Sequence, residues 1–372
     1  MNNSLLLLIA IAVSSLGAHT PVIANDNPVL TDRQVADLLL SPDRDDHQRG
    51  VKYVFDNKPN LTSQISRLIG GLSSDNRLVA SACAIGLSHG SWDPKAIEEH
   101  VPQLIELLSA NSDAARRGAY TALNRIAPSL RDRVPDLIAK AAQNSMAMNS
   151  ILTISKGIGL NNRQWIEAWL PLATSENSTI RDRCRYEIQS VRKSSRILIQ
   201  LIETDQPDSV VVAILGTLAS YRQKPKHAGE LAIRMLCHRS SKVRAAAIAA
   251  LDEIPHDWSS SRSDLLRIAR TDDEELRAAA TCRLFSDPSL GKTREEMDFE
   301  EKQVTDLIDR AFSDDSSSVR RSACLASRFT QADRLWIARK LLERLSDPDG
   351  EVRMAAQVAI RTRVGFALYV VN

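Results

Sequence analysis

The residues whose types and spacing suggest chemistry begin with Gly86-Leu-Ser-His-Gly90, which matches the G-x-S-x-G pattern of serine hydrolases. In those enzymes the serine lies on a strained turn between a strand and a helix. Here the residues from Leu78 to Leu87 read as a helix, and Ser91-Trp-Asp-Pro94 follows. We interpret Gly86 to Gly90 as the end of a helix with glycine stops, and we do not predict a hydrolase.

The densest basic stretch of the chain lies just beyond its middle. Arg181, Arg185 and Arg192 are expected to share one stripe of a helix, a pattern that suits a phosphate, a sulfate or an acidic peptide. Arg183 and Glu187 are four residues apart, and such a pair contributes only about 0.3–0.5 kcal/mol if it is exposed. A solvated charged helix is the competing interpretation.

Two tryptophans, Trp165 and Trp169, lie four residues apart on the preceding helix. Tryptophans at this spacing plug a core seam more often than they form a ligand platform. The candidate binding residues are therefore the following seven: Arg181, Arg183, Arg185, Glu187, Arg192, Trp165 and Trp169.

Other chemistry is not indicated. The five cysteines are spread singly, without C-x-x-C or a Cys/His cluster at metal spacing, and Cys184 and Cys324 read as buried substitutes for alanine. Gly157-Ile-Gly159 lacks the third glycine and the preceding strand of a dinucleotide site. We predict no catalytic residue, no metal and no cofactor. A structural disulfide is the less favoured reading of the cysteines.

The elements that must position these residues are repeated helices. Starting from Val243, apolar or small residues fall at offsets of 0, 3, 4, 7 and 8, which mark one face of a helix. Weaker copies start at His47, Leu78, Ala115, Met146, Ile180, Val210, Leu276, Val319 and Val352. The ten starts are separated by 31, 37, 31, 34, 30, 33, 33, 43 and 33 residues. A period near 33 indicates a stacked array, in which alanine and glycine at offsets 3 and 4 let the partner helix approach closely.

A further amphipathic helix precedes each copy, as in Val101–Leu108 and Leu231–Leu236. The two helices are joined by acidic or serine-rich turns, whose side chains are expected to cap the second helix. Offset 1 is arginine in six of the ten copies: Arg116, Arg181, Arg244, Arg277, Arg320 and Arg353. Arginine and aspartate recurring once per repeat predict a ladder of bonds between neighbouring turns.

An aspartate turn followed by Val-Arg-x-Ala-Ala resembles the HEAT-repeat family, and especially the short bacterial form also seen in phycobilisome lyases. The resemblance covers residues 31–364 and is almost silent on function. With an aromatic content of 4%, it predicts an all-α fold, a right-handed α-solenoid of about ten HEAT-like helical hairpins.

The two ends and one break depart from the repeat. Residues 1–24 read as a secretory signal peptide, with an apolar core over Leu5–Val13 and a small-residue cleavage site before Asn25; an uncleaved anchor is the alternative. We expect the solenoid over 25–364, with an insertion at 286–302 that is either a binding loop or a solvated extension. The apolar tail 365–372 is expected to fold back on the last hairpin or to self-associate.

These features favour an exported, non-catalytic interaction scaffold that binds a protein or peptide along its concave face. It is expected in the periplasm or outside the cell, without a membrane span once the signal is removed. The alternative is a lyase-like enzyme that acts on a bound ligand, with Arg183 and Glu187 as its only named polar pair. A net charge of +2 argues against a nucleic-acid partner. The identity of the partner and the oligomeric state stay open.

Overall fold

A computed structural model describes residues 29–292, 295–328 and 334–370, so the expected signal segment 1–24 lies outside the described residues. The described chain consists of α-helices, short 3₁₀ turns and one isolated bridge between Asn60 and Ser91. The chain is therefore all-α, as predicted. Ten helix pairs follow one another in this part of the chain, which confirms the predicted number.

The first helices of the pairs are α2 (Asp32–Leu40), α4 (Ile65–Leu72), α7 (Val101–Leu107), α9 (Val134–Gln143), α11 (Asn162–Trp169), α13 (Ser194–Ile202), α15 (Ala228–Met235), α17 (Trp258–Thr271), α19 (Phe299–Ala311) and α21 (Arg334–Arg344). The second helices are α3 (Arg44–Asn57), α5 (Arg77–His89), α8 (Asp113–Arg125), α10 (Ser145–Gly157), α12 (Ser178–Ser190), α14 (Asp208–Ala219), α16 (Ser241–Glu253), α18 (Glu274–Leu284), α20 (Ser317–Ala326) and α22 (Gly350–Val370). The shorter elements are α6 (Lys95–Glu98), η1 (Thr62–Gln64), η2 (Ala127–Arg133), η3 (Leu170–Thr174) and η4 (Pro288–Gly291).

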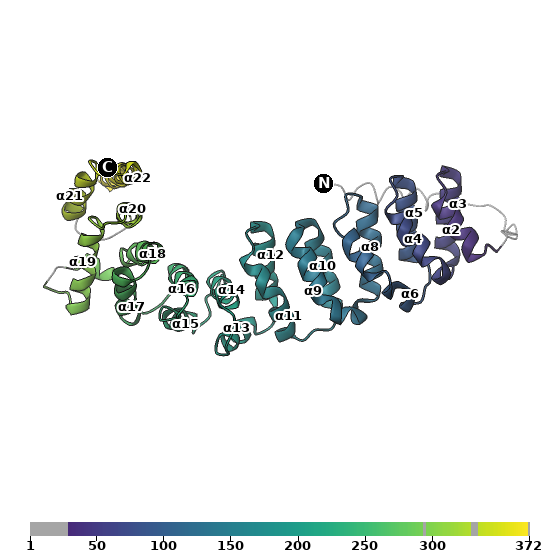
Figure 1. Cartoon of the computed structure of the whole chain (residues 1–372), viewed down its shortest axis with the longest axis horizontal. Helices are drawn as coiled ribbons and strands as arrows, with labels where there is room; N and C mark the ends of the chain where they lie inside the picture. Colours follow the sequence, from purple (N-terminus) through teal and green to yellow (C-terminus); the bar gives the residue numbers. More distant parts are fainter. Residues whose placement is uncertain (1–28, 293–294, 329–333, 371–372) are drawn as a thin grey trace. The chain divides into compact units, whose positions relative to one another are not determined.

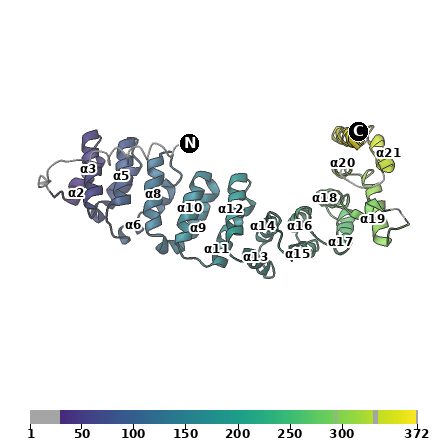
Figure 2. The ribbon, with the colours of Figure 1, turned by 180° about the vertical axis from the view of Figure 1, so that it is seen from behind.

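The helix pairs are grouped into two compact units, Met1–Ile126 and Ala127–Asn372. Within each unit the second helices lie side by side. In the first unit α5 contacts both α3 and α8, and in the second unit α16 contacts α14 and α18 (Figures 1 and 2). Within each unit, neighbouring pairs thus bury their apolar stripes against one another, which is how a repeat array builds its core.

Small residues at the predicted offsets are packed tightly, which confirms the reason given for them. Gly118 lies at offset 3 of α8, where a Cβ atom would come 2.6 Å from Leu72 Cδ2 of α4. Gly50 occupies the same offset in α3, where a Cβ atom would come 2.9 Å from Leu38 Cβ. Side chains at these positions would hold the helices apart.

The predicted starting residue of the buried stripe is wrong by one position in two second helices. Leu78 and Met146 are 46% and 56% exposed, and the buried stripes begin instead at Val79 and Ala147. In α5 two adjacent large apolar residues fit the same pattern, so the spacing alone does not determine which of them faces the core. In α14 the start, Val210, is half-buried, but Ala213, Ile214 and Leu218 are buried as predicted.

The turns cap most second helices as expected, although Pro207 before α14 and Ser240 before α16 make no side-chain capping bond. Ser112 accepts a hydrogen bond from the Ala115 amide, and Asp273 Oδ1 accepts one from the Leu276 amide at 3.0 Å. Each cap satisfies a backbone N–H group that has no partner inside its helix.

Three of the recurring arginines, Arg244, Arg277 and Arg320, form the predicted ladder in the second unit. Arg244 donates from Nη1 to the carbonyl oxygens of His238 and Arg239 in its own turn, at 2.8 and 3.0 Å. Its Nε and Nη2 donate to both carboxylate oxygens of Asp272 in the next turn, at 2.8 and 2.6 Å. One side chain therefore fastens two consecutive repeats.

The next two rungs follow the same plan. Arg277 Nη2 donates to Asp314 at 3.1 Å, and Arg320 donates to both oxygens of Asp347 at 2.9 Å. Arg116, by contrast, bonds only within its own turn, to Asp113 and to two carbonyl oxygens.

The insertion at 286–302 is tied to the stack by buried charges. Asp287 is buried and accepts hydrogen bonds from Arg262 of α17 at 2.8 and 3.3 Å. Glu301, at the start of α19, pairs with Lys292 at 2.7 Å and lies 3.6 Å from the Arg262 guanidinium. The described part of the insertion is therefore packed by ion pairs and is not a free loop.

At the C-terminus the backbone of the apolar tail continues α22 through Val370, whereas we expected the tail to fold back. The side chains beyond residue 362 lie outside the described ones. Among the described residues, no helix combines the length and the apolar character needed to cross a bilayer.

Candidate binding surface

Arg183 and Glu187 of α12 are engaged with each other. Glu187 is buried at offset 7 of its helix, a position where most other repeats carry a small or apolar residue. Its two carboxylate oxygens pair with Arg183 Nη2 at 2.8 Å and with Lys156 Nζ of α10 at 2.9 Å. The Glu187–Lys156 ion pair thus joins α12 to α10, the second helix of the preceding pair, a contact that the sequence spacing did not predict.

The expected stripe of three arginines is only partly formed. Arg181 donates from Nη1 to the Ser175 carbonyl oxygen at 3.0 Å and so braces its own turn. Arg192 lies beyond the end of α12 at Ser190 and is exposed. The prediction that Arg192 shares a helical stripe with Arg181 and Arg185 is therefore wrong, because the helix ends first.

Trp165 and Trp169 are buried in the core of the second unit. Their rings stack with centroids 5.8 Å apart and planes inclined by 27°. The Cys184 thiol of α12 donates to the Trp169 carbonyl oxygen at 2.9 Å, so the pair is covered by the second helix. Both rings fill a seam between helices and present no platform at the surface.

Arg185 has the most unusual environment of the seven candidates. Its Nε donates to the Ala173 carbonyl oxygen at 2.9 Å, and its guanidinium lies against Gly216 of α14. Burial lowers the pKa of Arg185 and the positive charge of Arg181 lowers it further, while the negative charge of Asp182 offsets part of this. Among the described residues no carboxylate lies within ion-pair distance of this half-buried cation.

Arg185 lines a hollow of about 620 Å³ on the second helices, which we call the second-helix hollow. The hollow extends over α12, α14 and α16. Its small residues are Gly216, Ala219, Ala246 and Ala249, and its charged residues are Arg185, Arg222, Lys224 and Glu253. Lys224 Nζ donates to the Ala219 carbonyl oxygen and lies 4.0 Å from Glu253.

Sequence reasoning singled out Arg185 and missed the rest of the second-helix hollow. A signal was present, because Gly216 and Ala219 are three residues apart, as are Ala246 and Ala249. Small residues repeated at this spacing on neighbouring second helices predict a shallow surface. The basic residues of the α14–α15 turn gave no such signal, because their position depends on the fold of the turn.

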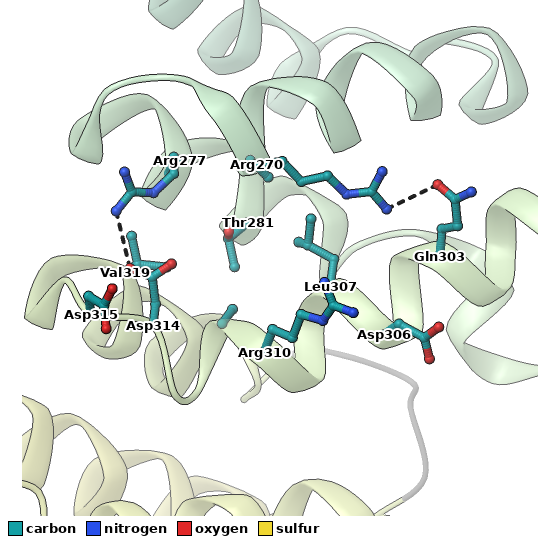
Figure 3. A pocket seen from close by; sticks show the side chains of 12 residues that line it. Arg270, Arg277, Thr281, Gln303, Asp306, Leu307, Arg310, Asp314, Asp315 and Val319 are labelled. Carbon is teal, nitrogen blue, oxygen red and sulfur yellow. Dashed lines mark hydrogen bonds and ion pairs between the residues drawn. The ribbon is translucent and has the colours of Figure 1, made fainter.

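A second hollow of about 680 Å³, the α17–α20 hollow, lies between two consecutive pairs (Figure 3). It is lined by three arginines and three aspartates, so its formal charges balance. Arg277 is already paired with Asp314, and Arg270 donates to Gln303 at 3.0 Å. Two of its three arginines are thus engaged within the hollow and its formal charges balance, whereas the second-helix hollow holds three basic groups and one acid.

The remaining motif and the cysteines have structural explanations. Ser88 donates to the Ala84 carbonyl oxygen inside α5, and the Gly90 amide donates to Gly86, which confirms a helix end. Gly86 itself is a packing position, since a Cβ atom there would come 2.9 Å from Leu39 Cδ1.

Cys184 and Cys324 are buried as predicted, and burial raises the pKa of each thiol to about 12. The five cysteines are free thiols. No His, Cys, Asp or Glu group in the described part of the chain is arranged to hold a metal ion.

Comparison with known proteins gives neither a family nor a function. The sequence matches no family model and no curated protein. Among solved structures, an engineered protein is 17% identical with a TM-score of 0.36, and the match covers 90% of this chain and 99% of the other.

Two natural proteins give comparable matches. A chain in the structure of Kap95p with RanGDP is 14% identical, with a TM-score of 0.39, over 90% of this chain and 50% of the other. A chain in the Pds5–Scc1 complex is 13% identical, with a TM-score of 0.39, over 89% and 63%. This chain therefore spans about half to two thirds of the length of those two chains.

Proposed function

We propose that this chain is a non-catalytic, exported interaction scaffold, and that a protein or peptide partner lies along the face made by its second helices. The observation that carries the proposal is the second-helix hollow, which extends over three successive repeats. A partner that crosses α12, α14 and α16 would contact equivalent positions of each repeat, as extended ligands of repeat proteins do.

The small residues of the hollow support an extended partner. Gly216, Ala219, Ala246 and Ala249 leave the backbone of α14 and α16 close to the surface, so a partner's side chains can enter the hollow. The charged residues at its edge then fix the orientation of the partner, because a small number of placed polar groups gives specificity to a largely apolar contact.

The lyase-like alternative receives no support from an observation on this chain. It was based on Arg183 and Glu187, and these residues are paired with each other and with Lys156. Neither residue lines the second-helix hollow or the α17–α20 hollow.

Site-specific photo-crosslinking tests the proposal directly. A photoreactive residue at Ala249, exposed on α16, is expected to give a discrete adduct with a partner in the native host. The matched control is Arg234, which is exposed on α15, the first helix of the same pair. Adducts that are equal at the two positions, or absent from both, would refute binding along the second helices.

Export is tested separately, by the N-terminal sequence of the protein recovered from its host. We expect the mature chain to begin at Asn25, after removal of residues 1–24. Recovery of a chain that retains its apolar N-terminal segment in the cytoplasmic fraction would contradict the export part of the proposal.

A further inference from the structure

We infer that the second-helix hollow receives an acidic side chain, aspartate or glutamate, of an extended peptide partner, and that Arg185 is its counter-ion. The inference rests on the proposed function, because it names the chemistry of the partner that the proposed function leaves open.

Arg185 has hydrogen-bonding capacity left over. The side chain is half-buried, and its only hydrogen bond among the described residues runs from Nε to the Ala173 carbonyl oxygen. Its Nη2 lies against Gly216, and neither terminal nitrogen has an acceptor in the described chain. Burying a cation without a counter-charge is unfavourable, and a carboxylate that binds both terminal nitrogens would remove that cost.

Comparable arginines of this chain already have a carboxylate. Arg244 pairs with Asp272, Arg262 with Asp287 and Arg320 with Asp347, at 2.6 to 2.9 Å. Arg125 has no carboxylate partner among the described residues, but its guanidinium lies over the Trp92 ring at 4.0 Å and donates to two carbonyl oxygens. Arg185 therefore differs from each of these arginines, because its terminal nitrogens are still free to bind an acceptor.

The second-helix hollow as a whole carries an excess of positive charge. Arg222 is exposed and has no ion pair in the described chain, while Lys224 has Glu253 at 4.0 Å as its nearest carboxylate. With Arg185 the lining holds an excess of two positive charges. An acidic ligand complements this excess, and the balanced α17–α20 hollow offers no such preference.

The structure also provides a way to displace Arg185 without removing it. A Cβ atom at Gly216 would come 2.7 Å from Arg185 Nη2, which is the mobile end of a long side chain. Gly216→Ala should therefore move the guanidinium while α14 stays folded, since alanine favours a helix more than glycine does.

The test is isothermal titration calorimetry of the full chain with an end-blocked hexaglutamate peptide. Comparison probes are the matching hexaglutamine peptide and inorganic phosphate. We expect binding of the glutamate peptide that weakens at least tenfold in Arg185→Gln and in Gly216→Ala, because a hydrogen-bonded charge pair is lost. The matched control is Arg192→Gln, which removes the same charge from an exposed site outside the hollow and should change affinity less than twofold.

Equal weakening by Arg192→Gln, equal binding of the glutamine peptide, or no binding of the glutamate peptide would overturn the inference. If phosphate binds and the glutamate peptide does not, the inference is overturned, and the ligand of the hollow is a small oxyanion. The two proposals can fail separately. Crosslinks at Ala249 that do not respond to Arg185→Gln would reject the acidic ligand and retain the scaffold, whereas the absence of crosslinks at Ala249 would reject the scaffold.

Discussion

The Arg320–Asp347 rung is the point where the stacking of two repeats can be perturbed most cleanly. Asp347 has a fully buried side chain and accepts two hydrogen bonds from Arg320, whose side chain is 11% exposed. Arg344 adds a third contact at 3.3 Å. Asp347→Asn keeps the shape of the side chain and the oxygen that accepts from the Asp349 amide, but it removes the negative charge.

The expected loss is about 3 kcal/mol. Removal of one partner from a buried ion pair costs about 3–5 kcal/mol, and some access of water to Arg320 places this rung at the lower end. Hydrogen exchange followed by mass spectrometry is the appropriate assay, because repeat arrays do not unfold in one step. Amides of α20 and α22 should exchange roughly 100-fold faster, since about 1.4 kcal/mol corresponds to a factor of ten.

The control is Glu351→Gln at the neighbouring Arg321–Glu351 pair, which joins the same two helices at 2.8 Å with side chains 51% and 69% exposed. Solvated pairs of this kind contribute about 0.2–1 kcal/mol. If Asp347→Asn accelerates exchange no more than Glu351→Gln does, the ladder does not fasten the repeats and the reasoning fails.

Three further predictions concern packing, thiols and pH. Gly71→Ala should speed the hydrogen exchange of α4 and α5 amides by the equivalent of about 1–3 kcal/mol, because its Cβ would collide with Cys83 Sγ. Gly70→Ala, with open space around it, should leave exchange unchanged or slow it by the equivalent of up to about 1 kcal/mol; equal effects would contradict the packing. A maleimide at pH 8 should label the exposed Cys237 first in the native chain. Three other thiols, Cys83, Cys184 and Cys324, are buried, and burial raises the pKa of each to about 12. Rapid labelling of any of these three in the native chain would contradict their burial. Hydrogen bonds from Arg320 lower the pKa of Asp347 in the folded chain. The stability that this carboxylate adds is therefore complete above its unfolded pKa of about 3.9 and is lost as pH falls through its lower folded pKa. The difference in melting temperature between the native chain and Asp347→Asn should shrink below about pH 4, and a constant difference would contradict this.

Much of the fold could be predicted because each repeat shows the same physical requirements in its own sequence. Ala246 and Ala247 indicate that two helices approach closely, and an aspartate turn before Val-Arg indicates a helix cap and a rung of the arginine ladder. These are local patterns with fixed spacing, so one chain is enough to recognise them.

The rest of the site depends on contacts between distant residues. Glu187 reads as a solvated charge, yet Lys156 from the preceding repeat allows it to be buried. Arg185 reads as one of several equivalent arginines, and only the position of Gly216 and η3 shows that it lacks a counter-charge. Arg192 was misplaced because nothing in the spacing shows that α12 ends at Ser190.

The most direct test of binding along the second helices is hydrogen exchange of the chain with and without its crosslinked or co-purified partner. We predict slower exchange at the exposed ends of α14 and α16 and in the turn that holds Arg222 and Lys224, with no change in α13 and α15. Protection confined to α13 and α15, the first helices of the same pairs, would contradict the account.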